Sequence, residues 1–140
     1  MKFKIGPLQE FWLQQLEKHP NKQMHEFLGK GNARSYKACC LGEGAICTYR
    51  FKKKKFNHLF DDGYLNLGGN SMEVAYYTLP SEFVNQLGLY NGQGEIRWTK
   101  HNEKASRYTS LADMNDRGVT WPEIAKFIRE NPSLVFKESK

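Results

Sequence analysis

The sequence predicts an α+β fold, with helices packed on a short antiparallel sheet of about three strands and a helical hairpin near the C-terminus. Two observations predict this class. Apolar residues recur at helical spacing in both outer parts of the chain, whereas the middle carries alternating, aromatic and β-branched residues between turn sequences. The length of 140 residues fits one domain, residues 1–140, that can bury a core without disulfides or metal.

Two helices are expected in the first 30 residues. The first begins at Pro7 and runs to about Lys18, because proline suits the first helical turn. Its apolar face is formed by Leu8, Phe11, Trp12 and Leu16. The second runs from Lys22 to Leu28 and ends at a glycine, and residues 30–35 then form a polar loop.

A third helix is expected over residues 36–51, YKACCLGEGAICTYRF. Gly42 and Gly44 each lower its helix preference by roughly 1 kcal/mol, so we expect them to allow close packing against another backbone. The following lysines interrupt the apolar pattern, and Asp61-Asp62-Gly63 is the strongest turn signal after them.

The strands are expected in the middle of the chain. Residues 64–67 and 72–79 alternate or are rich in β-formers around a Gly-Gly-Asn turn, which predicts a hairpin. A short helix should follow over Pro80–Leu87 and stop at Gly88. The segment EIRWT, residues 95–99, is the third expected strand.

The C-terminal hairpin, residues 111–128, has clear end signals. Ser110 with Asp113 can start its first helix, and Gly118 can end it. Thr120 and Glu123 form a capping-box pattern at the start of the second helix. We expect its apolar side chains to be buried against the first helix or the 39–49 segment: Trp121, Ile124 and Ile128.

Composition limits the compartment and the partner. A net charge of +6 and a pI near 9.2 favour an acidic partner. Three kinds of partner fit this charge: a host protein, a nucleotide or a nucleic acid. No leader pattern and no long apolar run occur, so a cytoplasmic location and no membrane are predicted. Three clustered cysteines are an odd number, which predicts reduced thiols.

The cysteines allow a weak catalytic hypothesis. Cys40 is the candidate nucleophile, but no histidine stands in a motif beside it. The competing interpretation is that the thiols are small buried core residues. Neither the cysteine spacing nor the scattered histidines fit a zinc site, so no metal and no cofactor are predicted.

Two polar segments are candidate partner-binding sites. The first is a basic run next to aromatic residues, which can contact phosphates together with Lys30, Arg34 and Lys37 or can simply be a solvated helix end. The basic run consists of Arg50, Lys52, Lys53, Lys54 and Lys55. The second is Asn115-Asp116, which can hold its own turn or form an exposed polar site.

Three separated motifs carry a family resemblance. CCLG at 39–42, LPSEFVNQLGL at 79–89 and LADMNDRGVTWPEIA at 111–125 stand in the order found in a family of small phage and bacterial proteins, which this chain resembles. Departures from the pattern are Glu43-Gly44, Met114 and Trp121-Pro122. The resemblance implies a phage or prophage accessory protein that acts in the host cytoplasm on host components, with host takeover or counter-defence as the setting.

Three functions follow, in order of preference. The first is a non-enzymatic binding protein that captures a host protein or a nucleotide-containing ligand, because no paired-carboxylate, metal or triad signature is present. The second is a general nucleic-acid-binding protein that uses the basic run. The third is a small enzyme that depends on Cys40.

Overall fold

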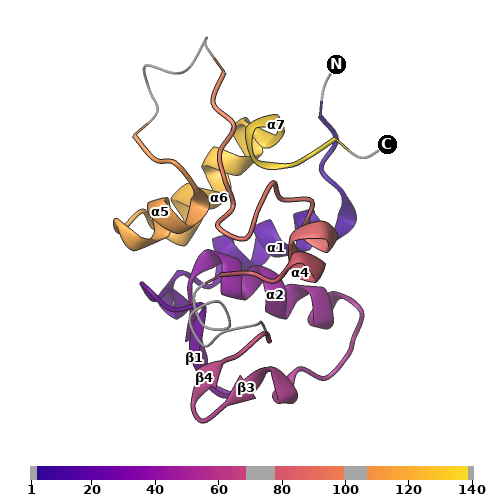
Figure 1. The fold of residues 1–140 in the computed structure, drawn as a ribbon, viewed down its shortest axis with the longest axis vertical. Helices are drawn as coiled ribbons and strands as arrows, with labels where there is room; N and C mark the ends of the chain where they lie inside the picture. The colour runs from indigo at the N-terminus through magenta and orange to yellow at the C-terminus, as the bar shows by residue number, and fades with distance from the viewer. Residues whose placement is uncertain (1–2, 69–77, 100–106, 139–140) are drawn as a thin grey trace.

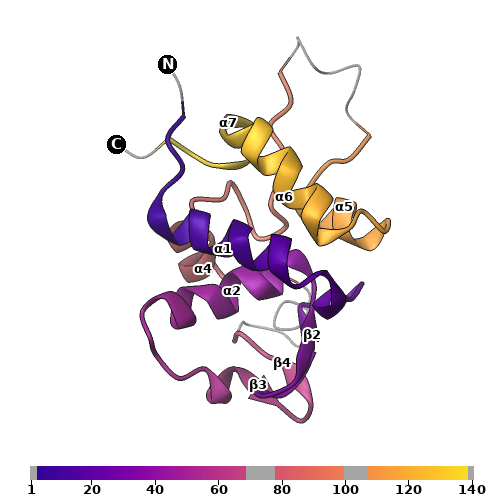
Figure 2. The same ribbon diagram turned by 180° about the vertical axis from the view of Figure 1, so that it is seen from behind.

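A computed structural model describes residues 3–68, 78–99 and 107–138. The fold is α+β, and α1 (Pro7–Lys18) lies at its centre. On one side, α1 packs against α6 (Trp121–Glu130), and on the other side it packs against α2 (Cys40–Phe51) (Figures 1 and 2). The small sheet lies beyond α2, on the side away from the C-terminal helices (Figures 1 and 2).

Shorter helices complete the helical part of the described chain. They are η1 (Pro20–Lys22), η2 (Asn57–Leu59), α4 (Ser81–Leu87), α5 (Leu111–Asp116) and α7 (Pro132–Val135). The helix α4 packs on α2, and α5 contacts both α2 and α6. The rings of Phe3 and Phe136 stack with centroids 6.0 Å apart, which joins the two ends of the described chain.

Four strands form an antiparallel sheet in the described residues, in the order β2-β1-β4-β3. They are β1 (Gly29–Gly31), β2 (Tyr36–Ala38), β3 (Phe60–Asp61) and β4 (Tyr64–Leu65). Both Asp62 and Gly63 have positive φ, at 53° and 82°, as a two-residue turn between twisted strands requires. Because Lys30 pairs with Lys37 across β1 and β2, both lysines lie on one face of the sheet.

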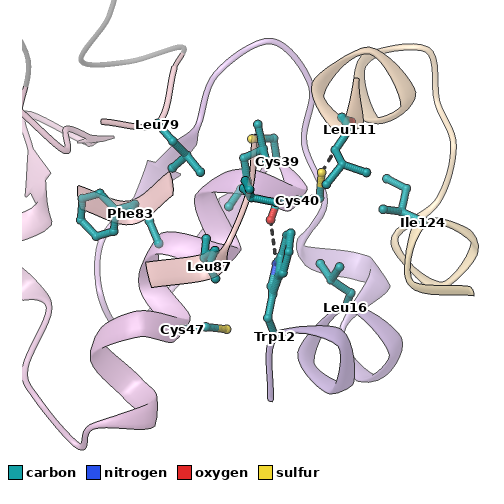
Figure 3. Close-up of a cluster of buried hydrophobic side chains, with 14 of the residues drawn as sticks. Trp12, Leu16, Cys39, Cys40, Cys47, Leu79, Phe83, Leu87, Leu111 and Ile124 are labelled. Carbon is teal, nitrogen blue, oxygen red and sulfur yellow. Dashed lines mark hydrogen bonds between the residues drawn. The ribbon is translucent and has the colours of Figure 1, made fainter. Parts of the chain in front are cut away.

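One continuous core joins the helices and the inner face of the sheet. Trp12 from α1 and Phe136 contact edge-to-face within it, and both are fully buried (Figure 3 shows Trp12 among its neighbours). Trp121, Ile124 and Ile128 are also fully buried, which confirms their expected burial, and α6 packs against the first helix as expected. No helix in residues 3–68, 78–99 or 107–138 has the length and apolarity needed to cross a membrane.

Gly42 in α2 explains how the sheet meets this helix. A Cβ atom at Gly42 would overlap the carbonyl oxygen of Leu28, so only glycine allows this backbone approach. Gly44 faces side chains instead: a Cβ atom added there would lie 2.9 Å from Leu87 Cδ1 and 3.2 Å from the Trp12 ring. The expectation that these glycines permit close packing is therefore confirmed, against a backbone for Gly42 and against side chains for Gly44.

Several elements form where the sequence predicts them. The first helix, α4 and the two helices of the C-terminal hairpin are confirmed, and Gly88 and Gly118 take the left-handed φ values of 73° and 90° that end a helix. The hydroxyl oxygen of Ser110 accepts the Asp113 N–H at 3.0 Å, and that of Thr120 accepts the Glu123 N–H at 3.4 Å. These are the predicted caps.

The expected helix over Lys22–Leu28 is wrong, whereas the loop expected over 30–35 is confirmed for residues 32–35 and corrected for residues 30 and 31, which belong to β1. After η1, the Met24 N–H donates to the Ala38 carbonyl at 2.9 Å and Gln23 forms a parallel bridge with Ala38, and residues 25–28 then bend without forming a helix. Residues 29–31 and 36–38 then pair as a β-hairpin. The helical spacing of residues 24–28 did not decide the conformation, because tertiary partners bind the backbone of this segment instead: the Ala38 carbonyl and the Asn115 side chain at Met24, and the Asp116 carboxylate at Glu26.

Two further predictions need correction. The helix expected over 36–51 begins only at Cys40, because residues 36–38 belong to β2. The strand expected over 95–99 is a single bridge between Glu95 and Ser110, with the Arg97 N–H donating to the Leu134 carbonyl at 2.8 Å. For the hairpin expected over 64–67 and 72–79, β4 covers the start of the first strand, and most of the second lies outside the described residues.

Candidate anion-binding site

The three cysteines lie in the core rather than at a surface (Figure 3). Cys40 is fully buried, its thiol donates to the Leu111 carbonyl at 3.6 Å, and its own carbonyl accepts the indole N–H of Trp12 at 2.9 Å. Burial raises the pKa of the Cys40 thiol well above its ordinary value, which opposes formation of a nucleophilic thiolate. We therefore place Cys40 in the core and not in the candidate site.

Asn115 has no exposed surface, and its side chain joins three parts of the chain. Its Oδ1 accepts the backbone N–H of Cys40 at 3.1 Å and the indole N–H of Trp121 at 3.2 Å. Its Nδ2 donates to the Met24 carbonyl at 2.7 Å. Because the Cys40 N–H is one of the amides left unpaired at the start of α2, Asn115 caps this helix from a position 75 residues away in the sequence.

Gln23 and Asp116 complete this Asn115 junction. The Gln23 amide donates to Asn115 Oδ1 at 3.1 Å, and its oxygen accepts the Trp121 N–H at 3.0 Å, so Gln23 caps the start of α6. Asp116 is exposed, but its Oδ1 accepts the Glu26 N–H at 2.9 Å, where Glu26 has a φ of 75°. The junction thus uses Asn115 for the fold, and of the predicted pair only Asp116 remains accessible.

The basic run divides at the end of α2. The half-buried Arg50 turns back onto the fold, where its Nη1 donates to Gln15 Oε1 at 3.2 Å and lies 3.7 Å from Glu43 Oε1. Lys52–Lys55 are exposed, and the Lys52 ammonium donates to Gln86 Oε1 at 3.3 Å. These lysines lie beyond the C-terminal end of α2, whereas the β1–β2 hairpin lies near its start (Figures 1 and 2). The structure therefore separates the two groups of cations that the sequence joined in one patch.

A second basic surface forms a pocket at the β1–β2 hairpin. This β-hairpin pocket has a volume of about 330 Å³ and brings together residues of η1, β1, the connecting turn and β2. Its lining residues are Asn21, Lys22, Lys30, Arg34, Ser35, Tyr36 and Lys37. Four of these side chains are cationic, and none of them is acidic. The arrangement can therefore attract an anion and donate several hydrogen bonds to it.

Local structure fixes the shape of this pocket. The side chain of Asn32 accepts the N–H groups of Arg34 and Ser35 at 2.9 and 3.0 Å, which closes the turn between the two strands. Gly31 has a φ of 120°, and a Cβ there would overlap the Ser35 carbonyl. Lys22 reaches the pocket from η1 and holds its ammonium 4.2 Å from the centroid of the Tyr36 ring, a cation–π contact.

A buried carboxylate lies behind the wall of the pocket. Tyr36 is 7% exposed, and its hydroxyl donates to the two carboxyl oxygens of Glu43 at 2.9 and 3.1 Å. Glu43 itself is 1% exposed, and the Cys47 thiol donates to its Oε1 at 3.7 Å. The pocket is therefore connected through one aromatic ring to an acid in the core.

Two opposed effects act on Glu43. Burial raises its pKa, while hydrogen bonds from Tyr36 and Cys47 and the charges of Arg50 and Lys22 lower it, with a net shift upward. Burial and the nearby carboxylate together raise the pKa of the Tyr36 hydroxyl far above its ordinary value, so this hydroxyl remains a donor. Lys22 thus contributes both to the pocket and to the field at Glu43.

The sequence reasoning missed Lys22, Tyr36 and Glu43 as site residues. The alternation of Tyr36, Lys37 and Ala38 is a short strand signal, but a helix prediction covered it. Glu43, Cys47 and Arg50 stand at spacings of four and three residues, which puts them on one face of a helix. That spacing was the available signal for the buried acid.

No family model matches the chain, and neither a curated protein nor a solved structure does. Within residues 3–68, 78–99 and 107–138, no group of three or more His, Cys, Asp or Glu side chains is placed to hold a metal ion.

Proposed function

We propose that this protein is a non-enzymatic binding protein that captures a nucleotide-containing ligand in the β-hairpin pocket. One observation carries the proposal: four cationic side chains from three elements and a turn line a single pocket without an acidic residue among them. A nucleotide or a short stretch of nucleic acid offers phosphates that guanidinium and ammonium groups bind well.

The size and donors of the pocket support this ligand class. A volume of about 330 Å³ lies within the range of small-molecule sites, and Asn21 and Ser35 add neutral polar groups to the lysines and the arginine. The four positive charges of the pocket exceed the negative charge of a single phosphate group, so a ligand with two or more phosphates matches the pocket better. The competing partner is an acidic surface of a host protein, which carries negative charge as the phosphates do.

A general nucleic-acid-binding protein is the second candidate. The exposure of Lys52, Lys53, Lys54 and Lys55 favours it, because exposed lysines can follow a phosphate backbone. We rank it lower because Arg50, the guanidinium of the basic run, already donates to Gln15 and pairs with Glu43. The small pocket that Lys52 and Lys54 line is also lined by Glu82, whose negative charge opposes an anion there.

We place this binding in the cytoplasm of a bacterial host. The resemblance to small phage and bacterial proteins supports a phage-type accessory role, and three unpaired cysteines suit a reducing compartment. In this role the protein would withhold or redirect a host component.

The test compares two variants that lose the same charge in different places. The first carries Lys30→Gln, Arg34→Gln and Lys37→Gln, and the second, its matched control, carries Lys52→Gln, Lys53→Gln and Lys54→Gln. Fluorescence anisotropy with labelled adenosine triphosphate and with labelled single-stranded DNA measures binding at several salt concentrations. We expect the first variant to bind about tenfold more weakly or worse, with a lower salt dependence, because phosphate contacts release counterions.

The control variant should lose much less affinity, through its lower net charge alone. If the control loses DNA binding and the pocket variant keeps it, the basic run is the site and the second candidate replaces the first. If neither probe binds wild-type protein at low salt, while acidic host proteins bind, the partner is a protein surface.

A further inference from the structure

We propose that the occupancy of the β-hairpin pocket by an anion is coupled to protonation of Glu43, with Lys22 and Tyr36 as the link between them. This inference rests on the proposed function, because it concerns the same pocket. It assigns to a buried acid of the core a regulatory role: the protein binds its ligand more tightly as the pH falls.

The geometry places both ends of the link in contact with one ring. Tyr36 lines the pocket, and its hydroxyl is 2.9 Å from the nearer carboxyl oxygen of Glu43. Lys22 also lines the pocket, and its ammonium lies 4.2 Å from the centroid of the same ring. An anion that binds the Lys22 ammonium therefore lies near the Tyr36 ring, whose hydroxyl contacts the carboxyl group of Glu43, a residue that is 1% exposed.

The sign of the coupling follows from the charges. The positive charge of Lys22 favours the ionised form of Glu43. An anion on Lys22 offsets that charge and adds a negative charge, so both changes favour the protonated carboxyl group. Glu43 then takes a proton from the solvent, and linkage requires that protonation of Glu43 strengthens anion binding by the same factor.

Four groups face Glu43 and share in its titration. They are Tyr36 from β2, Lys22 from η1, and Cys47 and Arg50 from α2. Among these four groups, only Lys22 and Tyr36 also line the pocket. The effect of Cys47 and Arg50 on Glu43 should therefore stay the same when an anion binds. His19 is a second titrating group near this surface, and its pKa is lowered by burial and by Lys22, Arg50 and Lys18.

Sulfate is the probe, because it carries two charges and does not titrate near neutral pH. Nuclear magnetic resonance suits this 16.3 kDa chain and reports each group separately. Backbone amide shifts of residues 21, 22, 30, 34 and 37 show whether sulfate occupies the pocket. The side-chain carboxyl 13C shift of Glu43, assigned through bonds from its backbone, gives the pKa in sulfate and in chloride at matched ionic strength.

We expect the pKa of Glu43 to be higher in sulfate than in chloride. In the Lys22→Gln variant, the pKa of Glu43 should already be raised in chloride, and sulfate should change it little. The matched control is Lys37→Gln, which lines the same pocket without contributing to the titration of Glu43. This variant should weaken sulfate binding but leave the pKa of Glu43 in chloride unchanged.

The outcomes separate the two proposals. Sulfate-dependent amide shifts at the pocket with an unchanged pKa of Glu43 would overturn the coupling and leave the proposed function standing. Absence of any pocket shift at high sulfate would remove both. The imidazole shifts of His19 are followed in the same spectra, so its titration is not confused with that of the carboxyl group.

Discussion

The Asn115 junction and the Glu43 cluster, which consists of Glu43 and its buried partners Tyr36 and Cys47, are both polar and both buried, yet they differ in charge and in position. Asn115 is neutral, fully enclosed, and bonded to the backbone of Cys40 and Met24 and to Trp121. Glu43 is ionisable and lies directly behind a wall of a basic pocket. A buried amide can be satisfied completely by the fold, whereas a buried carboxyl group responds to any charge that approaches it.

Because of this difference, the junction serves the fold, whereas the cluster lies next to the candidate binding site. The junction holds the starts of α2 and α6 together and presents little to a partner. The Glu43 cluster places titrating groups beneath the β-hairpin pocket, a surface that can bind a partner. Substitutions in the two regions should therefore change different properties, stability in one and its pH dependence in the other.

The largest effect is expected at the junction. Asn115→Leu removes the acceptor of the Cys40 N–H and of the Trp121 indole N–H, and both donors stay buried. We expect a loss of about 4 kcal/mol in the free energy of unfolding. Urea denaturation measures it, with the exposed Asp116→Asn as the control, which should cost about 1 kcal/mol or less. Equal losses in the two variants would show that the junction is not what joins the helices.

A slightly smaller effect is expected where the sheet meets α2. Gly42→Ala places a Cβ against the Leu28 carbonyl and forces two backbones apart. We expect a loss of about 3 kcal/mol by the same measurement. The control is Gly63→Ala, where a Cβ meets no atom within 4 Å and only the positive φ opposes the substitution, for about 1 kcal/mol. A larger loss at Gly63 would contradict the close approach.

The Glu43 cluster should show a pH-dependent effect that the junction lacks. The folded pKa of Glu43 is raised from 4.5, so its stabilising contribution is complete below that value and is lost as the pH rises through the folded pKa. In Glu43→Gln this loss should disappear, so the variant should gain stability relative to wild type as the pH rises. Urea midpoints at a series of pH values measure this difference.

Other carboxylates do not obscure that comparison. The hydrogen bonds and charge of Arg129 lower the pKa of Glu10, so its contribution has the opposite sign and is lost as the pH falls. Because Glu10 is present in both proteins, its contribution cancels in the difference. A constant difference at every pH would mean that Glu43 does not titrate in the range tested.

The smallest effect is expected at the cysteines. Burial raises the pKa of Cys39 to about 11, and those of Cys40 and Cys47 rise well above the ordinary value. Cys40→Ala should cost about 1 kcal/mol and leave nucleotide binding unchanged. A disulfide reagent should label the native thiols only as fast as the protein opens, and fully in denaturant. Loss of binding in a folded Cys40→Ala would return this thiol to the candidate site.

The resemblance motifs gain a physical interpretation from these contacts. In CCLG, Cys39 caps α2 by accepting the Gly42 N–H at 3.3 Å, the Cys40 N–H donates to Asn115, and Gly42 admits the Leu28 backbone. In the third motif, Asn115 forms the other half of the same junction. Two motifs that lie far apart in the sequence therefore describe one set of contacts, which sequence spacing could not indicate.

Local signals in the sequence determined the ends of α1, α4, α5 and α6, the turn at Asp62-Gly63 and the burial of the apolar face of α6. These features depend on neighbouring residues, through caps, left-handed glycines and helical periodicity, so the sequence carries them directly. They were also enough to predict an α+β fold with a C-terminal helical hairpin.

Tertiary structure alone decided the two polar regions. The strands β1 and β2 pair with each other, and β1 pairs with β4; with η1 and the turn between the two strands, this pairing assembled Lys22, Lys30, Arg34 and Lys37 into one pocket. The same packing buried Asn115 and Glu43, and it brought Arg50 to Glu43 and Gln15. Hydrogen bonds between distant segments and charges brought together across them have no periodicity in the sequence, so only the folded chain could reveal them.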